Sequence, residues 1–590
     1  MLDELLGSGS EFDRASAVLG IALKGRCPGC RPLTRAELES YPLRRFVVGW
    51  AHSRTISGTD YEFRVLLDSD FPRSRIRVAV QGDLYLHWPH VEEHGVLCLP
   101  TLLAPLANPE GVLARTLDDA ETLVARCAAD PAFVEQELSR EFLSYWHRSV
   151  KDKNAPVRSL LNVNERATRR IAVWRGKNIN LVADSKSAVE RWSQNFGYEV
   201  KPTDSGYFCF LDRPFIPPFP ATGSEFLALL EARCPEVVEL FKNARVSLDQ
   251  TIVFVLAAAV SSGVGLIAVS LKLASLNGYR KDAALSAEHK LLIWKRSGRI
   301  EALNVERVDP AWIHGRGVNA DLEKLHAAKI AVLGCGSIGS QVAVRLAQLG
   351  IGSLVLVDSE ALEPANIGRH ALGASSIDNA KAKELEKQIR RRFPHMQEVL
   401  GISKRWQSLE SFELEKLKGA DLIVSCMGDW PAEGVLNEWH HQLAGEPPVI
   451  YGWLDENGTA AHALCARGRG PCLACVLDAD GALRVPETDW DEGGRLQTEP
   501  ACGTTYQPYG PTDVLQAEAL ICNLVVDVLT GRSTRPEHRI YATCTARVKE
   551  LGGRWSKAHM ETRPAGFDGP FEFSRPVEPQ RDCPLCGGVS

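Results

Sequence analysis

Residues 329–358 read KIAVLGCGSIGSQVAVRLAQLGIGSLVLVD, and this stretch decides the fold of the C-terminal half of the chain. Its apolar runs predict a buried strand at 330–333, a helix at 340–349 and a second buried strand at 353–357. A strand, a glycine-rich turn, a helix and another strand form a βαβ unit, which implies a parallel sheet of the Rossmann type.

The turn between the first strand and the helix carries three spaced glycines, Gly334, Gly336 and Gly339. The first permits the tight turn, the second lets a phosphate approach the backbone, and the third lets helix and strand pack closely. The N-terminus of the helix then offers free N–H groups to the phosphates. Asp358, about 20 residues further on, can accept a hydrogen bond from a ribose hydroxyl. The stretch therefore predicts a nucleotide site.

Polar residues downstream of Asp358 distinguish this site from one for a nicotinamide cofactor. Hydride transfer gives no evident use to Asn366, Arg369 and Lys381 just past the ribose-binding acid. An enzyme that acts on a triphosphate does use such residues, because Arg and Lys can neutralise charge on the α-phosphate and on the leaving pyrophosphate. A further apolar run at 421–429 ends in Asp429, at the strand end where open α/β sheets bind ligands.

This order of residues resembles the adenylating superfamily of E1 enzymes, ThiF and MoeB, which follow a glycine-rich turn with Asp, Asn, Arg, Lys and a later Asp. The resemblance implies ATP as a substrate, Lys381 rather than Lys383 as the family lysine, and Asp429 as a residue that helps to hold Mg²⁺. It also implies a homodimer, because such domains usually dimerise. An ATP-free Rossmann-like domain is the alternative.

The composition limits the class of protein. The 590 residues suffice for three or four domains, and 45% hydrophobic with 24% charged residues is ordinary for a globular chain. A net charge of −6 without a long basic run argues against nucleic acid as the main partner. Sixteen cysteines are too sparse here for a disulfide scaffold, and several form CxxC pairs. We therefore expect a reducing cytoplasm, with thiol chemistry and a bound metal. No signal peptide is recognisable at the N-terminus.

Residues 251–271 form an uncharged apolar segment that is about long enough to cross a bilayer. Ser261, Ser262 and Gly263 divide it into halves of strand length. We therefore predict a buried pair of strands rather than a membrane helix, and no membrane as a partner.

Residues 13–150 are predicted to form an N-terminal α+β domain. Alternation and β-branched residues predict strands at 44–53, 61–68 and 75–82, and helical periodicity predicts helices at 117–128 and 131–146. The close pair Cys27 and Cys30 near the start has no obvious local partner, so two ordinary cysteines are the preferred interpretation.

After the third strand the chain reads LHWPHVEEHGVLCLP at 86–100. The order of helix, meander, Trp88-Pro89-His90 and Cys98 resembles the ubiquitin-conjugating E2 fold, in which a His-Pro-Asn tripeptide shortly precedes the catalytic cysteine. The resemblance implies that Cys98 carries a thioester. It places His90 where the family has the Asn that supports the oxyanion, with His87 as a second candidate. The alternative is a buried, inert cysteine.

Residues 151–315 predict an α/β linker domain without a recognisable catalytic motif. A helix is expected at 226–244 and strands at 291–309. A plain spacer is the alternative to a role in presenting the target or holding a dimer.

Residues 316–590 complete the predicted adenylation domain and contain two distant CxxC pairs, Cys472 with Cys475 and Cys583 with Cys586. Two such pairs can complete a tetrahedral four-cysteine Zn²⁺ site, which ThiF- and MoeB-like proteins also carry, and separate redox pairs are the alternative. Because the site is coordinatively closed, we expect it to be structural rather than catalytic.

Between these pairs, Cys502 leads a loop rich in Gly, Thr and Pro that precedes an apolar helix at 514–529. In E1 enzymes the thioester cysteine lies on such a segment, so the resemblance makes Cys502 the nucleophile that attacks the acyl-adenylate. Cys522 and Cys544 lie in regular apolar runs and are expected to be structural.

The whole chain thus predicts an α/β multidomain protein with an E2-like domain, a linker domain and a Rossmann-like E1 domain. That order resembles the bacterial E2–E1 fusions of CBASS antiphage systems. The resemblance implies adenylation of a protein C-terminus, with a cGAS/DncV-like nucleotidyltransferase as the activated protein, thioesters on Cys502 and then Cys98, and transfer to an amine. It also implies a JAB-family deconjugating peptidase as a partner. A sulfur-carrier adenylyltransferase and a non-catalytic E2-like docking module are the alternatives.

Overall fold

The computed structural model describes residues 10–42, 44–100, 108–150, 155–176, 180–198, 203–243, 251–260, 263–273, 286–316, 319–478, 481–491, 497–498, 505–506 and 508–587. The chain divides into two compact units. One consists of Met1–Arg158, Asn162–Val182 and Thr203–Glu306, and the other of Ser159–Leu161, Ala183–Pro202 and Arg307–Ser590.

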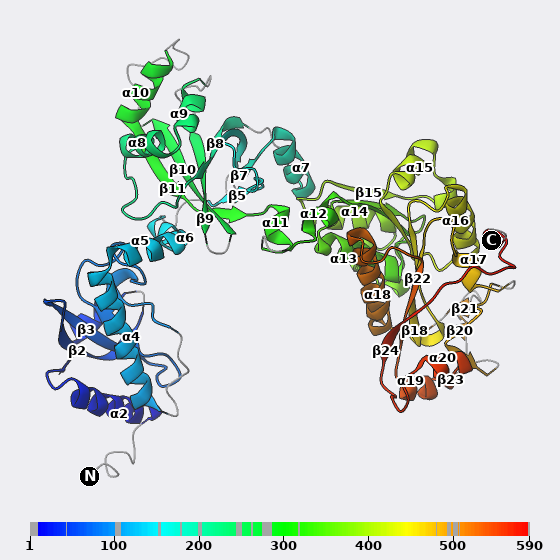
Figure 1. The fold of residues 1–590 in the computed structure, drawn as a ribbon, viewed down its shortest axis with the longest axis horizontal. Helices are drawn as coiled ribbons and strands as arrows, with labels where there is room; N and C mark the ends of the chain where they lie inside the picture. The colour runs from blue at the N-terminus through cyan, green and yellow to red at the C-terminus, as the bar shows by residue number, and fades with distance from the viewer. Residues whose placement is uncertain are drawn as a thin grey trace. The chain divides into compact units, whose positions relative to one another are not determined.

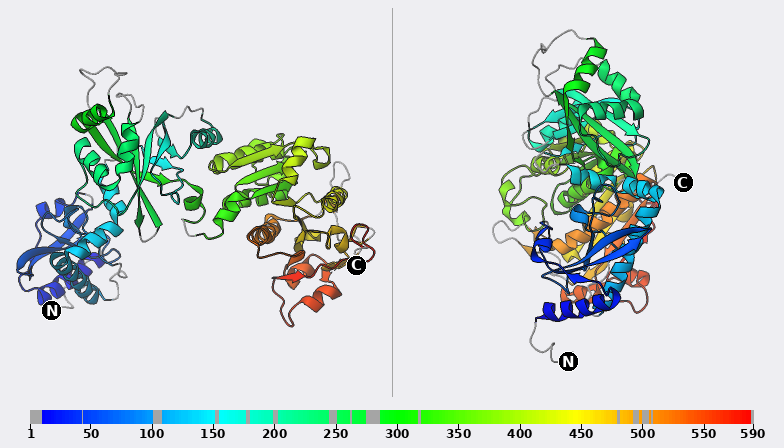
Figure 2. Two further views of the ribbon diagram at one scale, coloured as in Figure 1. Left: turned by 45° about the horizontal axis from the view of Figure 1, so that its top comes forward. Right: turned by 90° about the vertical axis from the view of Figure 1, so that its left-hand side faces the viewer.

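The first unit opens with a four-stranded antiparallel sheet, which confirms the predicted meander. Its strands, in spatial order, are β1 (Arg31–Pro32), β2 (Phe46–Ile56), β3 (Thr59–Asp68) and β4 (Arg77–Val80). Helices α2 (Glu11–Arg26) and α4 (Pro109–Ala129) pack on one face of this sheet (Figure 2). Leu19 of α2 and Leu117 of α4 are fully buried there against Phe63 of β3. The apolar side chains of strands and helices thereby share one core.

Local capping residues set where the helices of this part begin. Asn108 accepts a hydrogen bond from the N–H of Gly111 at 2.8 Å, and Pro109 follows at the first helical position of α4. The predicted helix at 131–146 is two helices, α5 (Pro131–Arg140) and α6 (Phe142–Ser149), because the chain departs from helical geometry at Glu141. Two short turns complete this part, α3 (Arg35–Glu39) and the 3₁₀ helix η1 (Glu93–Gly95).

A second sheet, most of which belongs to the first unit, has the strand order β11-β10-β9-β8-β6-β7-β5-β12. Its strands are β5 (Val157–Ser159), β6 (Arg169–Arg175), β7 (Asn180–Ala183), β8 (Thr203–Leu211), β9 (Ile252–Val260), β10 (Gly263–Leu273), β11 (Gly298–Leu303) and β12 (Val305–Arg307). The predicted strand pair is confirmed, because β9 and β10 are antiparallel and buried at the centre of the core. Within the described part of the chain, no helix is both long and apolar enough to span a membrane.

The helices on this sheet correct two predictions. Residues 291–297 are not the expected strand but lie in α10 (Ala287–Ser297), which Ser286 caps by accepting from the N–H of His289 at 3.3 Å. The run Leu-Leu-Ile-Trp is helical because Leu291 and Trp294 share the buried face while Leu292 is exposed. The expected helix at 226–244 is two, α8 (Gly223–Arg233) and α9 (Pro235–Lys242), since Pro235 starts a new helix. Cys209 and Cys234 are joined by a disulfide, a bond that the predicted reducing compartment does not favour.

The second unit is built on a mixed eight-stranded sheet (Figure 1). In spatial order its strands are β15 (Glu398–Ile402), β14 (Ser353–Val357), β13 (Lys329–Leu333), β16 (Leu422–Ser425), β17 (Val449–Leu454), β18 (Ala460–Ala466), β22 (Glu537–Ala542) and β24 (Phe571–Arg575). The first five are parallel, which confirms the Rossmann-like prediction, and the last three continue the sheet antiparallel. Short pairs β19 (Thr488–Trp490) with β23 (Gly553–Trp555), and β20 (Gln497–Thr498) with β21 (Thr505–Tyr506), lie outside it.

Helices cover both faces of this sheet. Val342, Leu385 and Ile521 are buried on one face, and Trp406 and Leu436 on the other. The helices of the unit are α7 (Lys186–Phe196), α11 (Pro310–Ile313), α12 (Leu322–Ala327), α13 (Ser337–Leu349), α14 (Lys381–Arg392), α15 (Ser411–Lys418), α16 (Trp430–Gln442), α17 (Leu473–Val476), α18 (Pro511–Thr530), α19 (Thr545–Glu550) and α20 (Lys557–Thr562). Its 3₁₀ turns are η2 (Pro364–Asn366), η3 (Ala374–Ser376), η4 (Trp406–Ser408) and η5 (Glu456–Gly458).

The order of the parallel strands fixes where a ligand can bind. The chain runs from β13 to β14 and β15 on one side, and then returns to place β16 and β17 on the other side of β13. A crevice forms at such a switch point, outside the carboxyl ends of the strands. The glycine-rich turn follows β13 directly, so it lies at this crevice.

Candidate functional site

A cavity of about 590 Å³ lies at the carboxyl ends of the parallel strands of the second unit. Its wall contains the predicted residues Gly336, Asn366, Arg369 and Lys381. Other lining residues come from segments far apart in sequence, and they are Ser337, Ile338, Cys426, Met427, Gly428, Trp430, Gly452, Trp453, Leu454, Asp455, Glu456, Gly481, Ala482, Leu483, Pro486, Thr488 and Tyr509. The predicted residues Gly334, Gly339, Asp358 and Asp429 lie next to the wall rather than in it.

The three glycines of the turn have different surroundings. Gly334 has a φ of +84°, and a Cβ there would lie 2.7 Å from Cα of Met427. A Cβ on Gly339 would overlap the carbonyl oxygen of Gly334. A Cβ on Gly336 would meet nothing within 4 Å, and this residue is the N-cap of α13. Gly336 therefore leaves open space at a helix N-terminus, which fits a phosphate group.

The carboxylate of Asp358 is used by the protein itself. Its two oxygens accept hydrogen bonds from the backbone N–H groups of Cys335 and Glu360, each at 2.7 Å. Burial raises its pKa above the usual range of a carboxyl group. Asp358 thus holds the glycine-rich turn in place, and its contact with a ribose stays a prediction.

The two cationic residues in the wall are held in different ways. Lys381, the first residue of α14, is 5% exposed, and its Nζ donates to Oε2 of Glu360 at 2.6 Å. The guanidinium of Arg369 lies 4.6 Å from the ring centroid of Tyr509 and donates to the carbonyl oxygen of Tyr509 at 3.2 Å. The hydroxyl of Tyr509 is 2.7 Å from Oγ of Ser337. Two positive charges therefore face the same space as Gly336.

Carboxylate groups hold the loop after β16 in place, and the carboxylate of Asp429 is itself used as a helix cap. Asp429 is the N-cap of α16 and accepts from the N–H of Ala432 at 3.3 Å. Below the loop, the buried carboxyl of Glu433 accepts from Oγ of Ser425 at 3.0 Å. Burial raises the pKa of Glu433 to about 7.

Sequence reasoning missed acidic and aromatic residues of the wall. Asp455 directly follows β17, so the rule that selected Asp429 could also have found it. Its Oδ1 lies 3.0 Å from Nε2 of the buried His462, whose ring stacks on Trp453 at a centroid distance of 4.7 Å. Asp455 and Glu456 are carboxylates suited to Mg²⁺, which prefers oxygen ligands. Tyr509 had no pattern that could have revealed it.

The thiol of Cys98 lies at the surface of the first unit, where the residue is exposed. The segment around it forms a tight hairpin in which Val91 pairs with Leu97 and the N–H of Cys98 donates to the carbonyl of His90 at 2.7 Å. On its other side the hairpin pairs with β4, through Ala79 opposite Val96. In an antiparallel pair, each step forward on one strand is a step back on its partner. One residue beyond the Val91–Leu97 pair, Cys98 is therefore opposite His90. Two residues beyond the Ala79–Val96 pair, Cys98 is opposite Arg77.

The ring of His90 is held between two acidic residues. Its Nε2 lies 3.3 Å from Oε2 of Glu137, and its Nδ1 lies 3.4 Å from Oε1 of Glu141. Its backbone N–H donates to the hydroxyl of Tyr145, which in turn donates to Glu141. His90 has a φ of +58°, so this network keeps a left-handed residue beside the thiol. His87, the second candidate, is exposed.

The four predicted metal ligands come together. The sulfur atoms of Cys472, Cys475, Cys583 and Cys586 all lie within 4.8 Å of one another, and all four residues are buried. The Sγ atoms of Cys472 and Cys583 are 3.7 Å apart, close to the spacing of about 3.8 Å expected around tetrahedral Zn²⁺. Asn437 donates to Sγ of Cys472 at 3.4 Å and accepts from the N–H of Leu473 at 3.1 Å, as groups around metal sites commonly do.

The remaining cysteine predictions have mixed outcomes. Cys502 lies outside the described residues. Cys522 is buried within α18, as expected of a structural residue, and burial raises its pKa. Cys544 is half-buried and caps α19 rather than lying in a strand. Cys27 is buried.

Matches to family models define two classes of domain in the chain. Residues 314–561 match the ThiF family, and residues 31–155 match prokaryotic E2 family B. The chain therefore joins an E2-like and an E1-like part, and the resemblance to E2–E1 fusion proteins is confirmed.

Several relatives carry the same description, ATP-dependent ubiquitin transferase-like protein Cap2. The protein from Pseudomonas aeruginosa is 22% identical over 79% of this chain and 85% of its own length. The protein from Vibrio cholerae is 29% identical, but the match covers 36% of this chain and only 37% of that protein. Among solved structures, Escherichia coli MccB is 18% identical over 45% of this chain and 69% of its own, with a TM-score of 0.32.

Proposed function

We propose that this protein is an ATP-dependent enzyme that activates the C-terminal carboxylate of another protein and carries it as a thioester. The observation that supports this most directly is the shared cavity wall of Gly336, Asn366, Arg369 and Lys381. The open space at Gly336 suits a phosphate, and the two cations suit a triphosphate. Asp429, Asp455 and Glu456 are the residues that would hold Mg²⁺, which would neutralise charge on the phosphates.

In the first step, a carboxylate oxygen of the substrate protein attacks the α-phosphorus of ATP, and the bond to pyrophosphate breaks. Lys381 and Arg369 stabilise the negative charge that develops on the α-phosphate and the leaving group. The product is a mixed anhydride of the carboxylate with AMP. Lys381 has to exchange Glu360 for a phosphate oxygen when the nucleotide binds.

In the next steps, the thiolate of Cys502 attacks the carbonyl carbon and AMP leaves. The thiolate of Cys98 then takes the acyl group from Cys502, and an amine of the target takes it from Cys98 to form an amide. The exposure of Cys98 supports this role, because an acyl donor and an acceptor must both reach the sulfur. His90 is the group proposed to support the oxyanion of the last step, and Glu137 and Glu141 orient its ring.

We further propose that the protein works in antiviral defence, with a cGAS/DncV-like nucleotidyltransferase as the activated protein, as a cytoplasmic homodimer. The resemblance to the E2–E1 fusions of CBASS systems is the ground for this assignment, and the Cap2 relative, described as ATP-dependent and ubiquitin transferase-like, supports its conjugating part. The four cysteines are proposed to hold Zn²⁺ as a structural ion. A JAB-family peptidase would reverse the conjugation.

The experiment that tests the activity is a trap for the carried protein. A Cys98→Lys variant expressed in its natural host should accumulate a stable amide at position 98, and mass spectrometry should identify a single C-terminal peptide attached there. Adding Cys502→Ala to that variant should abolish the adduct. An absence of any adduct at position 98, with an active adenylation step, would instead favour a sulfur-carrier adenylyltransferase, in which Cys98 has no role.

A further inference from the structure

A group of arginine side chains lines a pocket that reaches Arg77, the residue opposite Cys98. A pocket of about 520 Å³ in the first unit is lined by Phe46, Asp68, Ser74 and by the arginines Arg44, Arg45, Arg73, Arg75 and Arg77. Arg44 pairs with Glu92 and Arg73 with Glu11. In the described part of the chain, no ion pair engages the other three arginines. The guanidinium groups of these three arginines, against the carboxylate of Asp68, leave the pocket with a net positive charge.

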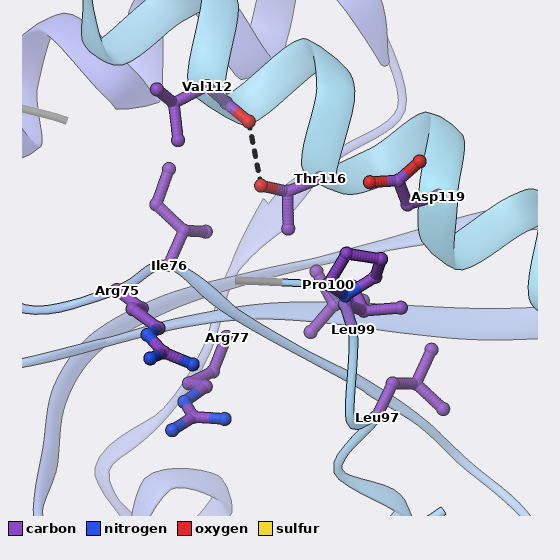
Figure 3. A pocket seen from close by; sticks show the side chains of 10 residues that line it. Arg75, Ile76, Arg77, Leu97, Leu99, Pro100, Val112, Thr116 and Asp119 are labelled. Carbon is purple, nitrogen blue, oxygen red and sulfur yellow. Dashed lines mark hydrogen bonds between the residues drawn. The ribbon is translucent and has the colours of Figure 1, made fainter. Parts of the chain in front are cut away.

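The position of Arg77 links this pocket to the thiol. The pairing of β4 with the hairpin places Arg77 directly opposite Cys98, and the N–H of Leu97 donates to the carbonyl of Val78 at 2.8 Å beside this pair. Directly opposed residues project from the same face with Cβ atoms about 5 Å apart. Figure 3 shows Arg75 and Arg77 pointing the same way, away from α4, which carries Thr116 and Asp119. Whatever is bonded to Cys98 therefore begins beside Arg77.

We propose that the arginine pocket binds an acidic segment of the protein carried on Cys98, directly before its thioester carbonyl. This proposal rests on the thioester role proposed above for Cys98. An extended chain advances about 3.3 Å per residue, so roughly the second to fifth residues before the carbonyl reach the pocket. Aspartate or glutamate at those positions would form paired hydrogen bonds with the guanidinium groups.

The acceptor is a poorer candidate for this pocket than the carried protein. The acceptor brings an amine to the thioester carbonyl, and a lysine side chain is positively charged until it loses its proton. Arg77 beside the thiol, and Arg45 and Arg75 in the same pocket, would repel that charge. A carboxylate-rich segment gains from the same field, which also steers it toward the thiol.

The test uses synthetic peptides that bypass the ATP-dependent step. Two decapeptides activated as C-terminal mercaptoethanesulfonate thioesters differ at the second to fifth positions from the carbonyl, where one carries Asp and Glu and the other Ser and Gln. The Cys98 thiolate attacks the carbonyl carbon, a new thioester forms, and mercaptoethanesulfonate leaves as a thiolate. The rate of loading on the Cys98 peptide of the full chain is measured by mass spectrometry.

We expect the acidic peptide to load roughly tenfold faster than the neutral one, and 0.5 M salt to reduce that advantage because it screens charges beyond about 4 Å. The double variant Arg45→Glu, Arg75→Glu should remove the preference, and Arg45→Gln, Arg75→Gln should reduce it with less risk to folding. Lys24→Glu is the matched control, because this exposed residue of α2 lies outside the pocket.

Equal loading of both peptides by the unchanged protein would overturn the acidic-segment proposal while leaving the thioester role of Cys98 intact. An equal loss of preference in Lys24→Glu would also overturn it, because net charge alone would then explain the effect. No loading of either peptide would overturn the thioester role itself, and this proposal with it.

Discussion

The cavity beside Gly336 draws its wall from residues scattered between 336 and 509, whereas the Cys98 site is made by one hairpin and its neighbours in space. In the cavity, Lys381 is almost completely buried and lies in the wall with Asn366 and Arg369. At the hairpin, the sulfur of Cys98 faces solvent. A recessed space lined by polar and apolar groups suits a small ligand, while an exposed thiol suits a reaction between two proteins. Under the proposed function, the comparison separates activation of a carboxylate from its transfer, and we expect that each part can be disabled alone.

The largest expected effect falls on the cavity side of the comparison. Lys381→Ala should lower the rate of ATP–pyrophosphate exchange by about 100-fold to 1,000-fold, because a buried charge that stabilises the developing negative charge is lost. Lys383→Ala is the matched control. Lys383 is exposed, pairs with Glu386 and does not line the cavity, so its rate should change less than about twofold. Equal losses in both variants would show that this cavity is not where the exchange occurs.

The reciprocal change tests the thiol side. Cys98→Ala should leave ATP–pyrophosphate exchange within about twofold of the unchanged protein, while the adduct on the E2-matching part disappears. Cys30→Ala on the same part of the chain should leave both readouts unchanged. If Cys98→Ala clearly lowered the rate of ATP–pyrophosphate exchange, activation and transfer would not be separate functions of the two sites.

The four-cysteine cluster belongs to neither site, so its loss should act on stability. Removing the metal with a chelator, or Cys475→Ser, should lower the melting temperature of the second unit by about 5 °C, which corresponds to roughly 3 kcal/mol for a region of about 300 residues. Cys544→Ser, outside the cluster, should shift it by less than about 2 °C. A protein shown by metal analysis to be metal-free, yet melting at the same temperature, would contradict the structural role.

The smallest expected effect concerns the carboxyl beneath the cavity loop. The pKa of Glu433 is about 7 in the folded protein, above its usual value of 4.5, because burial disfavours the charged form. Its neutral form therefore supports folding fully below about pH 4.5, and this support is lost as the pH rises through about 7.

Glu433→Gln removes this dependence, so the variant should gain roughly 1–3 kcal/mol over the unchanged protein between pH 5 and pH 8. Melting curves at both pH values measure the difference. Glu438→Gln, at an exposed position of α16, should show no such trend. A difference between Glu433→Gln and the unchanged protein that stays flat with pH would mean that this carboxyl is already charged in the fold.

The part of the fold that sequence reasoning could predict is the part encoded locally. The βαβ unit follows from apolar runs and spaced glycines within a short stretch, and the wall residues Asn366, Arg369 and Lys381 follow it closely in the chain. The two CxxC motifs are far apart in the sequence, but they still predicted a four-cysteine cluster. Two CxxC pairs commonly bind one Zn²⁺ ion together. The mistaken strand at 291–297 shows the limit, since a short apolar run does not by itself distinguish a strand from a buried helix.

The rest depends on which elements meet in space. Tyr509 reaches the cavity through its contacts with Ser337 and Arg369, more than a hundred residues earlier in the chain. Arg77 is opposite Cys98 only because of the register between β4 and the hairpin, which no local pattern encodes. Such neighbours become visible only once the strands are paired.

The bond between Lys381 and Glu360 has a consequence for how tightly a nucleotide can be held. The amine already has a carboxylate partner at 2.6 Å, so an arriving phosphate takes part in a counter-ion exchange rather than meeting a bare cation. The exchange returns less free energy than an unpaired lysine would, because the ion pair with Glu360 must break as the phosphate loses its water. In return, the ammonium is held inside the wall at all times, and spent nucleotide can leave without stranding a buried charge.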